Sequence, residues 1–289
     1  MSGPLLPFLA AWHFALGASV GSFLNVCIYR LPRGLPITGR SHCPTCGTTL
    51  RLADLVPLLS QLALKSRCRY CGARFSWRYF GIEALLGTVY AASFLFVAHT
   101  AGGDAALLAK LLIALTCLVG VIAVDLETYT IPDGFLVALA ATGVGYDLAL
   151  LALGSAAMPP IMVFGRVPVP QSILGALTGF AGLWLIGRLF SLVLRQEAMG
   201  FGDVKLTGAA GALLGPGLLL PAYFLLAVAL GAVVGLVVVV WRRLTRRVDS
   251  EHRVARTRLP FGPFLAVALA MALLFPDALR AGLSRLYGL

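Results

Sequence analysis

Two aspartates lie at the ends of long apolar segments, where an ionisable side chain is costly and therefore indicates a function. Asp125 closes one apolar run, and Asp203 opens another directly after Gly200-Phe201-Gly202. Two carboxyl groups from separate helices can hydrolyse a peptide bond when the ionised one takes a proton from water and the protonated one polarises the carbonyl group. The competing interpretation makes Asp203 and Asp133 helix N-caps and Asp125 a charge at a helix end.

Other residues near these aspartates, or near a helix end on the same side, are candidates for supporting roles. Gly200 and Gly202 would let a substrate strand or a neighbouring helix approach the backbone closely. Lys205 does not share the helical face of the second aspartate, and we expect it to contact the substrate or the lipid surface. Glu83 is either a buried partner for a basic residue or part of the substrate site. Asn25 is either an interhelical hydrogen-bonding residue or a site residue.

Four of the six cysteines form two pairs, Cys43 with Cys46 and Cys68 with Cys71, and a glycine follows each pair. Each pair places two thiolates on one tight turn, so two such turns can complete a tetrahedral zinc site. Two disulfides or a redox-active pair are the alternatives, and a cytoplasmic location, where thiols stay reduced, disfavours both. Because four sulfur ligands leave no position for water, this zinc would fold the loop rather than catalyse a reaction.

The elements that must position these residues are membrane helices. Hydrophobic residues make up 59% of the 289 residues and charged residues only 12%, a balance that excludes an ordinary soluble domain. Residues 206–241 contain no charge or histidine, and Gly215-Pro216-Gly217 divides them into two helices. Apolar runs of the required length predict about eight transmembrane helices, near residues 5–29, 80–98, 105–124, 134–153, 171–193, 200–218, 222–241 and 260–279.

The basic residues predict how the chain is oriented. Nine Lys and Arg residues lie between positions 30 and 78, and seven Arg residues lie between positions 242 and 258. Because basic loops are retained in the cytoplasm, both segments and both aspartates are expected on the cytoplasmic side of the membrane. The net charge of +11 is explained by these membrane-flanking loops, so no nucleic-acid partner is expected. No pattern indicates an oligomeric state.

The predicted fold is therefore all-α, a polytopic integral membrane protein with a small zinc-ribbon-like cytoplasmic loop. We divide the chain into a first transmembrane helix (1–30), a four-cysteine loop (31–79) and a membrane core with about seven transmembrane helices (80–289). The loop is too short to bury a core of its own, so it needs a cross-link such as zinc.

Five segments together resemble the prepilin peptidase family, also called type IV leader peptidases, along nearly the whole chain. They are Gly21-Ser22-Phe23-Leu24-Asn25-Val26 followed by Arg30-Leu31-Pro32, the paired-cysteine loop, the Asp125 segment ending in Ile131-Pro132-Asp133, the run Glu197 to Leu206, and Pro260-Phe261-Gly262-Pro263-Phe264. The resemblance implies that Asp125 and Asp203 are the catalytic pair of an aspartyl endopeptidase of the bacterial inner membrane, with its active site on the cytoplasmic side. Such enzymes cleave prepilins and pseudopilins of type IV pili and type II secretion systems after a glycine that precedes a hydrophobic helix.

The resemblance also implies a second reaction. Members with the paired-cysteine loop methylate the new amino terminus with S-adenosylmethionine, so an N-methyltransferase activity is expected here. No glycine-rich fingerprint locates the methyl-donor site. Two other classes of protein compete with this interpretation: another Gly-x-Gly-Asp intramembrane protease of the presenilin or signal peptide peptidase kind, and a transporter in which the two aspartates relay protons or bind a cation.

Overall fold

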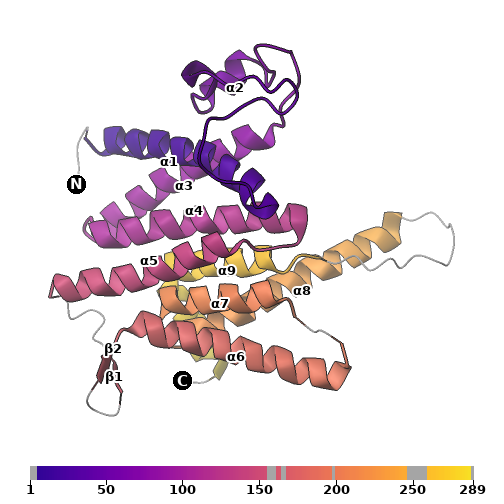
Figure 1. The fold of residues 1–289 in the computed structure, drawn as a ribbon. Coiled ribbons are helices and arrows are strands. Elements are labelled where there is room, and N and C mark those ends of the chain that lie inside the picture. Colours follow the sequence, from indigo (N-terminus) through magenta and orange to yellow (C-terminus); the bar gives the residue numbers. More distant parts are fainter. Residues whose placement is uncertain (1–4, 155–160, 164–166, 197–198, 246–258, 288–289) are drawn as a thin grey trace. The chain divides into compact units, whose positions relative to one another are not determined.

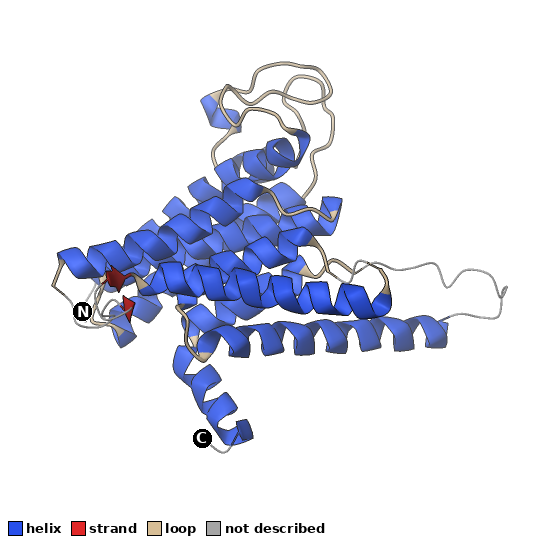
Figure 2. Ribbon diagram, turned by 60° about the horizontal axis from the view of Figure 1, so that its bottom comes forward, coloured by secondary structure: helices blue, strands red, loops and turns tan. Residues whose placement is uncertain are grey.

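The computed structural model describes residues 5–154, 161–163, 167–196, 199–245 and 259–287. Glu197 and Ala198 of the Asp203 motif, and residues 246–258 of the basic loop, lie outside the described residues. The chain forms two compact units, Met1–Val124 and Asp125–Leu289. Nearly all regular structure in both units is helical (Figure 2). The prediction of an all-α fold is therefore confirmed, with one short β-hairpin as an addition.

The first unit contains α1 (Leu5–Arg30), η1 (Leu31–Arg33), η2 (Leu52–Asp54), α2 (Leu59–Ala63), α3 (Arg78–Thr100) and most of α4 (Ala105–Thr128). Helices α1 and α3 pack side by side (Figure 1). Glycine permits this contact, because a methyl group added at Gly17 would overlap the carbonyl oxygen of Leu86, and one added at Gly21 would lie 2.8 Å from the Cα of Glu83. The four-cysteine loop joins these two helices.

The second unit contains α5 (Asp133–Ala152), β1 (Ile161–Val163), β2 (Val167–Val169), α6 (Gln171–Leu194), α7 (Phe201–Leu214), α8 (Leu219–Thr245), α9 (Gly262–Leu274) and α10 (Pro276–Tyr287). The two strands pair antiparallel, with Ile161 opposite Val169. Helix α7 contacts α5, α6, α8 and α9, so it forms the centre of this unit (Figure 1).

Small residues let α6 and α7 approach at backbone distance. Methyl groups added at Gly175 and Gly179 of α6 would overlap the backbone of α7 at Gly211 or lie close to it at Thr207. Ten of the fourteen residues of α7 are buried. Contacts with other helices therefore surround α7, and a helix of this length spans only about 21 Å.

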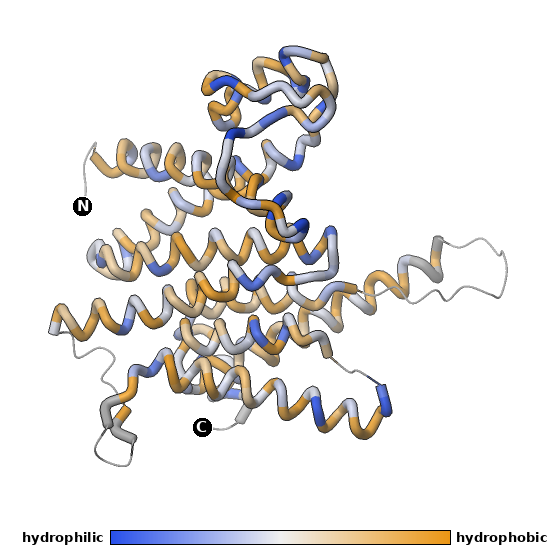
Figure 3. The backbone as a smooth tube through the Cα atoms, viewed as in Figure 1, coloured by the Kyte–Doolittle hydropathy of each residue, from blue (hydrophilic) through white to orange (hydrophobic). Residues whose placement is uncertain are grey.

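Six helices in the described residues are long and apolar enough to cross a membrane, namely α1, α3, α4, α5, α6 and α8. Hydrophobic residues run along most of these helices, whereas hydrophilic residues are frequent in the segment between α1 and α3 (Figure 3). Helices α9 and α10 count as a seventh span only if they are taken together, and a bend of 101° separates them. The prediction of eight spans is not confirmed, because α7 is shorter than the roughly 30 Å of a bilayer core.

The glycine-rich break in the charge-free run lies where it was predicted. Helix α7 ends at Leu214 and α8 begins at Leu219, and Gly215 takes the left-handed value φ 76°. The position requires glycine because other residues are strained at such an angle. The turn sends the chain back along the same unit.

Candidate active site and cysteine cluster

Asp125 lies in the last turn of α4 and is only 5% exposed. The helix ends three residues later, where Tyr129 adopts a left-handed conformation (φ 55°) while its N–H still donates to the Asp125 carbonyl oxygen. The Asp125 Oδ2 atom accepts a hydrogen bond from the backbone N–H of Gly262, 3.1 Å away at the start of α9. A hydrogen bond to a carboxylate favours its ionised form. The fold therefore holds the Asp125 carboxyl group at the end of α4 as a hydrogen-bond acceptor.

Asp203 lies in the first turn of α7, and its backbone N–H donates to the carbonyl oxygen of Gly200 at 3.1 Å. Gly200 is the N-cap residue of this helix, and no side chain caps it. The interpretation of Asp203 as an N-cap is therefore wrong. The carboxyl groups of Asp125 and Asp203 interact electrostatically. The second unit thus brings together two acidic groups that are 78 positions apart in the chain.

The residues behind Asp203 fix the first turn of α7. The Thr207 hydroxyl donates to the Asp203 carbonyl oxygen at 3.0 Å and lies 3.3 Å from the Tyr223 hydroxyl of α8. Tyr223 is fully buried. Sequence reasoning did not identify Thr207 or Tyr223, although two hydroxyl groups within a charge-free apolar run are a signal that could have found them.

Ile131 lies beside the first residues of both α7 and α9. A methyl group added at Gly202 would lie 3.5 Å from Ile131, which is an ordinary contact. A methyl group added at Gly262 would lie 2.5 Å from the Asp125 Oδ2 atom and 3.2 Å from Ile131 Cδ1. Close approach of neighbouring backbone was expected at Gly200 and Gly202. Of Gly200, Gly202 and Gly262, the steric requirement for glycine is strongest at Gly262, which the sequence marks only as part of a family motif.

Lys205 and Asp133 form an ion pair beside this site, with 2.8 Å between Nζ and Oδ1. The Lys205 ammonium also lies 5.1 Å from the centre of the Phe201 ring. Asp133 is not the N-cap of α5, since Pro132 occupies that position. The cap interpretation of Asp133 is therefore wrong, and its described contact is across to α7.

The four paired cysteines form one cluster. Their sulfur atoms all lie within 4.8 Å of one another, and the Sγ atoms of Cys43 and Cys71 are 3.9 Å apart. Sulfur ligands of a tetrahedral zinc ion lie about 3.8 Å apart when the Zn–S bonds are about 2.3 Å. All four are free thiols. The arrangement can hold a tetrahedral metal ion without rearrangement of the loop.

The two cysteine turns repeat one hydrogen-bond pattern. Gly47 N–H donates to the carbonyl oxygen of Cys43, and Gly72 N–H donates to that of Cys68. Both glycines are left-handed, with φ 69° and 71°. The Thr48 hydroxyl and backbone, hydrogen-bonded to the Cys46 sulfur, lower the pKa of this thiol to about 6. A thiol that ionises near neutral pH is a ready metal ligand.

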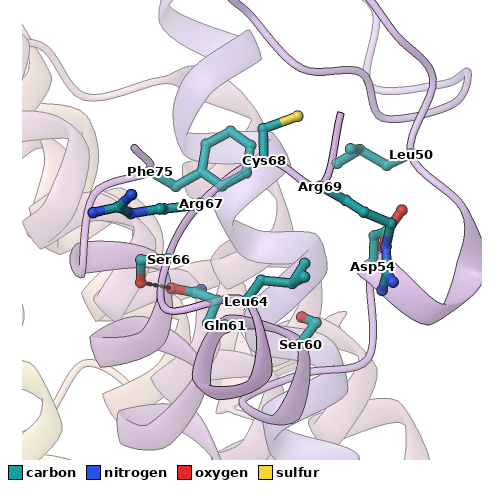
Figure 4. A pocket seen from close by; sticks show the side chains of 10 residues that line it. All are labelled: Leu50, Asp54, Ser60, Gln61, Leu64, Ser66, Arg67, Cys68, Arg69 and Phe75. Carbon is teal, nitrogen blue, oxygen red and sulfur yellow. Dashed lines mark hydrogen bonds and ion pairs between the residues drawn. The ribbon is translucent and has the colours of Figure 1, made fainter. Parts of the chain in front are cut away.

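The residues between the two cysteine pairs pack against the second turn. Figure 4 shows the side chains that line a partly open cavity here, among them Cys68, Arg69 and Phe75 of the second turn. The cavity has a volume of about 30 Å³. The Arg69 guanidinium binds Asp54 at 2.7 Å and holds the pKa of that carboxyl group below its usual range. A hydrogen bond joins Ser66 to Gln61 on the other side of the cavity. Side-chain contacts therefore supplement the cysteines in ordering the loop.

Glu83 and Asn25 belong to the unit that carries the cysteine cluster. Glu83 is buried near the start of α3, and its Oε2 atom accepts the N–H of Leu58 at 2.8 Å. Asn25 is buried in α1, and its Nδ2 atom donates to the Tyr79 carbonyl oxygen at 3.2 Å. Asn25 thus joins α1 to α3, as expected of an interhelical hydrogen-bonding residue. The Glu83 interaction ties the cysteine loop to the membrane helix.

Two family models match the chain: the bacterial peptidase A24 N-terminal domain at residues 15–97 and the type IV leader peptidase family at residues 111–238. Three curated proteins, each described as a prepilin leader peptidase/N-methyltransferase, are similar along most of their length. The protein from Pseudomonas putida is 35% identical over 94% of this chain and 93% of its own. The protein from Dickeya chrysanthemi is 36% identical over 92% of this chain and 93% of its own. The protein from Burkholderia pseudomallei strain K96243 is 35% identical over 95% of this chain and 90% of its own. No solved structure matches the chain.

Proposed function

This chain belongs to the type IV leader peptidase family, and we propose that Asp125 and Asp203 are the catalytic pair with which it cleaves prepilins. It is a membrane protein that acts as a prepilin peptidase and as an N-methyltransferase of the new amino terminus. The single observation that carries the assignment of the pair is the meeting of two carboxyl groups from α4 and α7 in one compact unit. The cleaved bond follows a glycine that precedes the hydrophobic helix of a prepilin or pseudopilin.

The hydrogen bond from Gly262 supports different roles for the two aspartates. Because this bond favours the ionised form of Asp125, we assign Asp125 to water activation and assign the shared proton to Asp203. Asp125 takes a proton from water as the water oxygen attacks the scissile carbonyl carbon, and Asp203 donates its proton to the carbonyl oxygen. Proton transfer from Asp125 to the nitrogen then lets the C–N bond break while one hydroxyl group of the intermediate returns its proton to Asp203. This restores both aspartates and releases the leader as a carboxylic acid together with a free amine.

The active site is proposed to face the cytoplasm. Support comes from the basic residues between positions 30 and 78 and between positions 242 and 258. A variant without native thiols, with a single cysteine near position 250, should resist an impermeant thiol reagent in intact cells and react after the cells are opened. Labelling in intact cells would place this loop outside and would exclude the proposed orientation in the inner membrane.

Zinc is the metal that the four-sulfur cluster fits. Cys43, Cys46, Cys68 and Cys71 would occupy all four positions of a tetrahedral ion, so the metal would stabilise the loop and take no part in hydrolysis. The second reaction uses S-adenosylmethionine, whose sulfonium group supplies the methyl group. The buried carboxylate of Glu83 fits a positively charged ligand of this kind.

Purified protein incubated with a prepilin in detergent tests the function against the two alternatives. Cleavage at the leader junction that is lost in Asp125→Asn and in Asp203→Asn is the expected result. Cleavage within the hydrophobic helix would indicate a Gly-x-Gly-Asp protease of the presenilin kind. Absence of any cleavage by folded wild-type protein would favour a transporter in which the two aspartates bind or relay a cation.

A further inference from the structure

Glu83 is a buried carboxylate whose described partners are all neutral. It is 5% exposed, and its Oε2 atom accepts a hydrogen bond from the Leu58 backbone N–H at 2.8 Å. Among the residues that the structure describes, no Lys or Arg forms an ion pair with it. A buried charge without an opposite charge is costly, so a positively charged group bound beside Glu83 would offset this cost.

Asn25 provides a buried acceptor atom without a hydrogen-bond donor. The residue is 3% exposed, and in the described part of the chain its Oδ1 atom has no hydrogen-bond donor. The amide cannot be flipped to relieve this, because its nitrogen donates to the Tyr79 carbonyl oxygen and an oxygen there would face another acceptor. The Oδ1 atom is therefore held in place while its own acceptor capacity goes unused.

The α1–α3 contact places the two acceptors near each other. Asn25 bonds to Tyr79, one helical turn before Glu83, and Gly21, one turn before Asn25, packs against the Glu83 backbone. Because glycine brings the two backbones into contact there, neither helix can shift to supply a missing donor. Glu83 lies opposite Gly21 and Asn25 lies opposite Tyr79, so the two acceptors are fixed about one helical turn apart along the α1–α3 contact.

A strained turn of the cysteine loop contacts Glu83. Leu58 has φ 63° and ψ −52°, and Leu59 N–H donates to the Pro57 carbonyl oxygen at 2.6 Å, a γ-turn of the rare, strained kind. The strained residue is the one whose N–H binds Glu83. Backbone strain that the surroundings maintain is concentrated at binding sites and switch regions. The turn lies between the two cysteine pairs, so order in the cluster and contact with Glu83 are linked.

We propose that Glu83 and Asn25 form the binding site for the positively charged group of the methylation reaction. The chemistry is recognition of a cation by a carboxylate and an amide oxygen, and the cation is either the sulfonium of the methyl donor or the ammonium of the new amino terminus. The proposal rests on the methyltransferase activity proposed above. In that reaction the ammonium group first loses a proton to water, the lone pair of the resulting amine forms the N–C bond, and the C–S bond breaks to leave an uncharged thioether.

The change of charge during transfer gives a direct test on the wild-type protein. Equilibrium binding to the full-length, zinc-loaded protein is compared for S-adenosylmethionine and for S-adenosylhomocysteine, which lacks the sulfonium charge. A processed pilin peptide and its N-acetylated form are compared in the same way. We expect at least tenfold tighter binding of the charged member of one pair, the size of a single charge-assisted contact. Equal binding within both pairs overturns the proposal.

Glu83→Gln removes the charge and keeps an oxygen that can accept the Leu58 N–H. Zinc content and cleavage should stay at the wild-type level, while methylation falls at least tenfold and the discrimination by charge is lost. If Glu83→Gln no longer binds S-adenosylmethionine more tightly than S-adenosylhomocysteine, the methyl donor is the ligand. If it no longer binds the free peptide more tightly than the N-acetylated one, the peptide is the ligand. Asp147→Asn is the matched control, since this buried carboxylate binds the Ser172 N–H at the start of α6, where the helix dipole stabilises it.

Two outcomes separate this proposal from the function on which it rests. If wild-type protein cleaves prepilin but methylates nothing under any condition, the methyltransferase activity itself is excluded and this site is excluded with it. If wild-type protein methylates and Glu83→Gln methylates equally well, with unchanged discrimination by charge, Glu83 is only a structural clamp for Leu58. In the second case the enzymatic function stands and the binding site is wrong.

Discussion

Replacement of Gly262 by alanine tests how Asp125 is positioned. The added Cβ would lie 2.5 Å from Asp125 Oδ2, whereas a carbon and an oxygen in van der Waals contact are about 3.3 Å apart, so about 0.8 Å must be gained by movement. Ile131 lies 3.2 Å from the same Cβ position and limits movement in its direction. The carboxylate must therefore shift or lose its hydrogen bond to Gly262. A displacement of about 1 Å in a catalytic group lowers the rate roughly 100-fold.

The assay is kcat/KM for cleavage of a prepilin in detergent as a function of pH. For Gly262→Ala we expect a loss of about 100-fold and an acid limb that moves to higher pH, because the lost hydrogen bond had favoured the ionised form of the pair. Gly145→Ala on α5 is the matched control, because its added methyl group meets nothing within 4 Å. If Gly262→Ala cleaves within threefold of the wild type with an unchanged pH profile, the proposed role of this glycine is refuted.

Three further predictions concern the two aspartates, the cysteine cluster and Gly202. Asp125→Asn and Asp203→Asn should each abolish cleavage without unfolding the protein, and the double variant should be hardly worse than either single one. Wild-type cleavage should show a bell-shaped pH dependence. Cleavage by folded Asp203→Asn protein would exclude the two aspartates as the catalytic pair. Cys43→Ser and Cys68→Ser should each remove about one zinc per chain and should impair methylation more than cleavage, and a protease-resistant loop in metal-free protein would contradict the zinc assignment. Gly202→Ala should lose less than tenfold in kcat/KM if only the contact with Ile131 matters, because that contact is of ordinary length; a larger loss in a folded variant would show that the glycine serves the substrate instead.

The positions of the helices could be predicted because long apolar runs have few alternatives in a membrane protein. The break at Gly215 was also visible, since glycine and proline interrupt the charge-free run there. The number of spans could not be predicted. Helix α7 is apolar because it packs against four other helices, and hydropathy does not distinguish a surface that faces protein from one that faces lipid.

The candidate site was predictable where it depends on side-chain type and not where it depends on contacts between distant segments. Asp125 and Asp203 could be paired from their chemistry and their apolar context, and their catalytic roles stay a prediction. The Gly262 N–H is a backbone group that every residue except proline possesses, so no residue type marks it as a donor. The bond between Lys205 and Asp133 joins positions 72 apart, and only the packing of α5 against α7 brings them together.

The enclosure of α7 has a consequence for how the enzyme responds to its membrane. Helix α8 is largely unburied along its apolar span, with 6% buried, so changes in lipid chain length can tilt it. Helix α7 is shorter than the bilayer core and is held by neighbouring helices through glycine contacts. Because α7 exposes little surface to lipid, a mismatch between helix length and bilayer thickness has little direct effect on it. The height of Asp203 in the second unit is therefore set by protein packing, and peptidase activity should vary little between thin and thick bilayers.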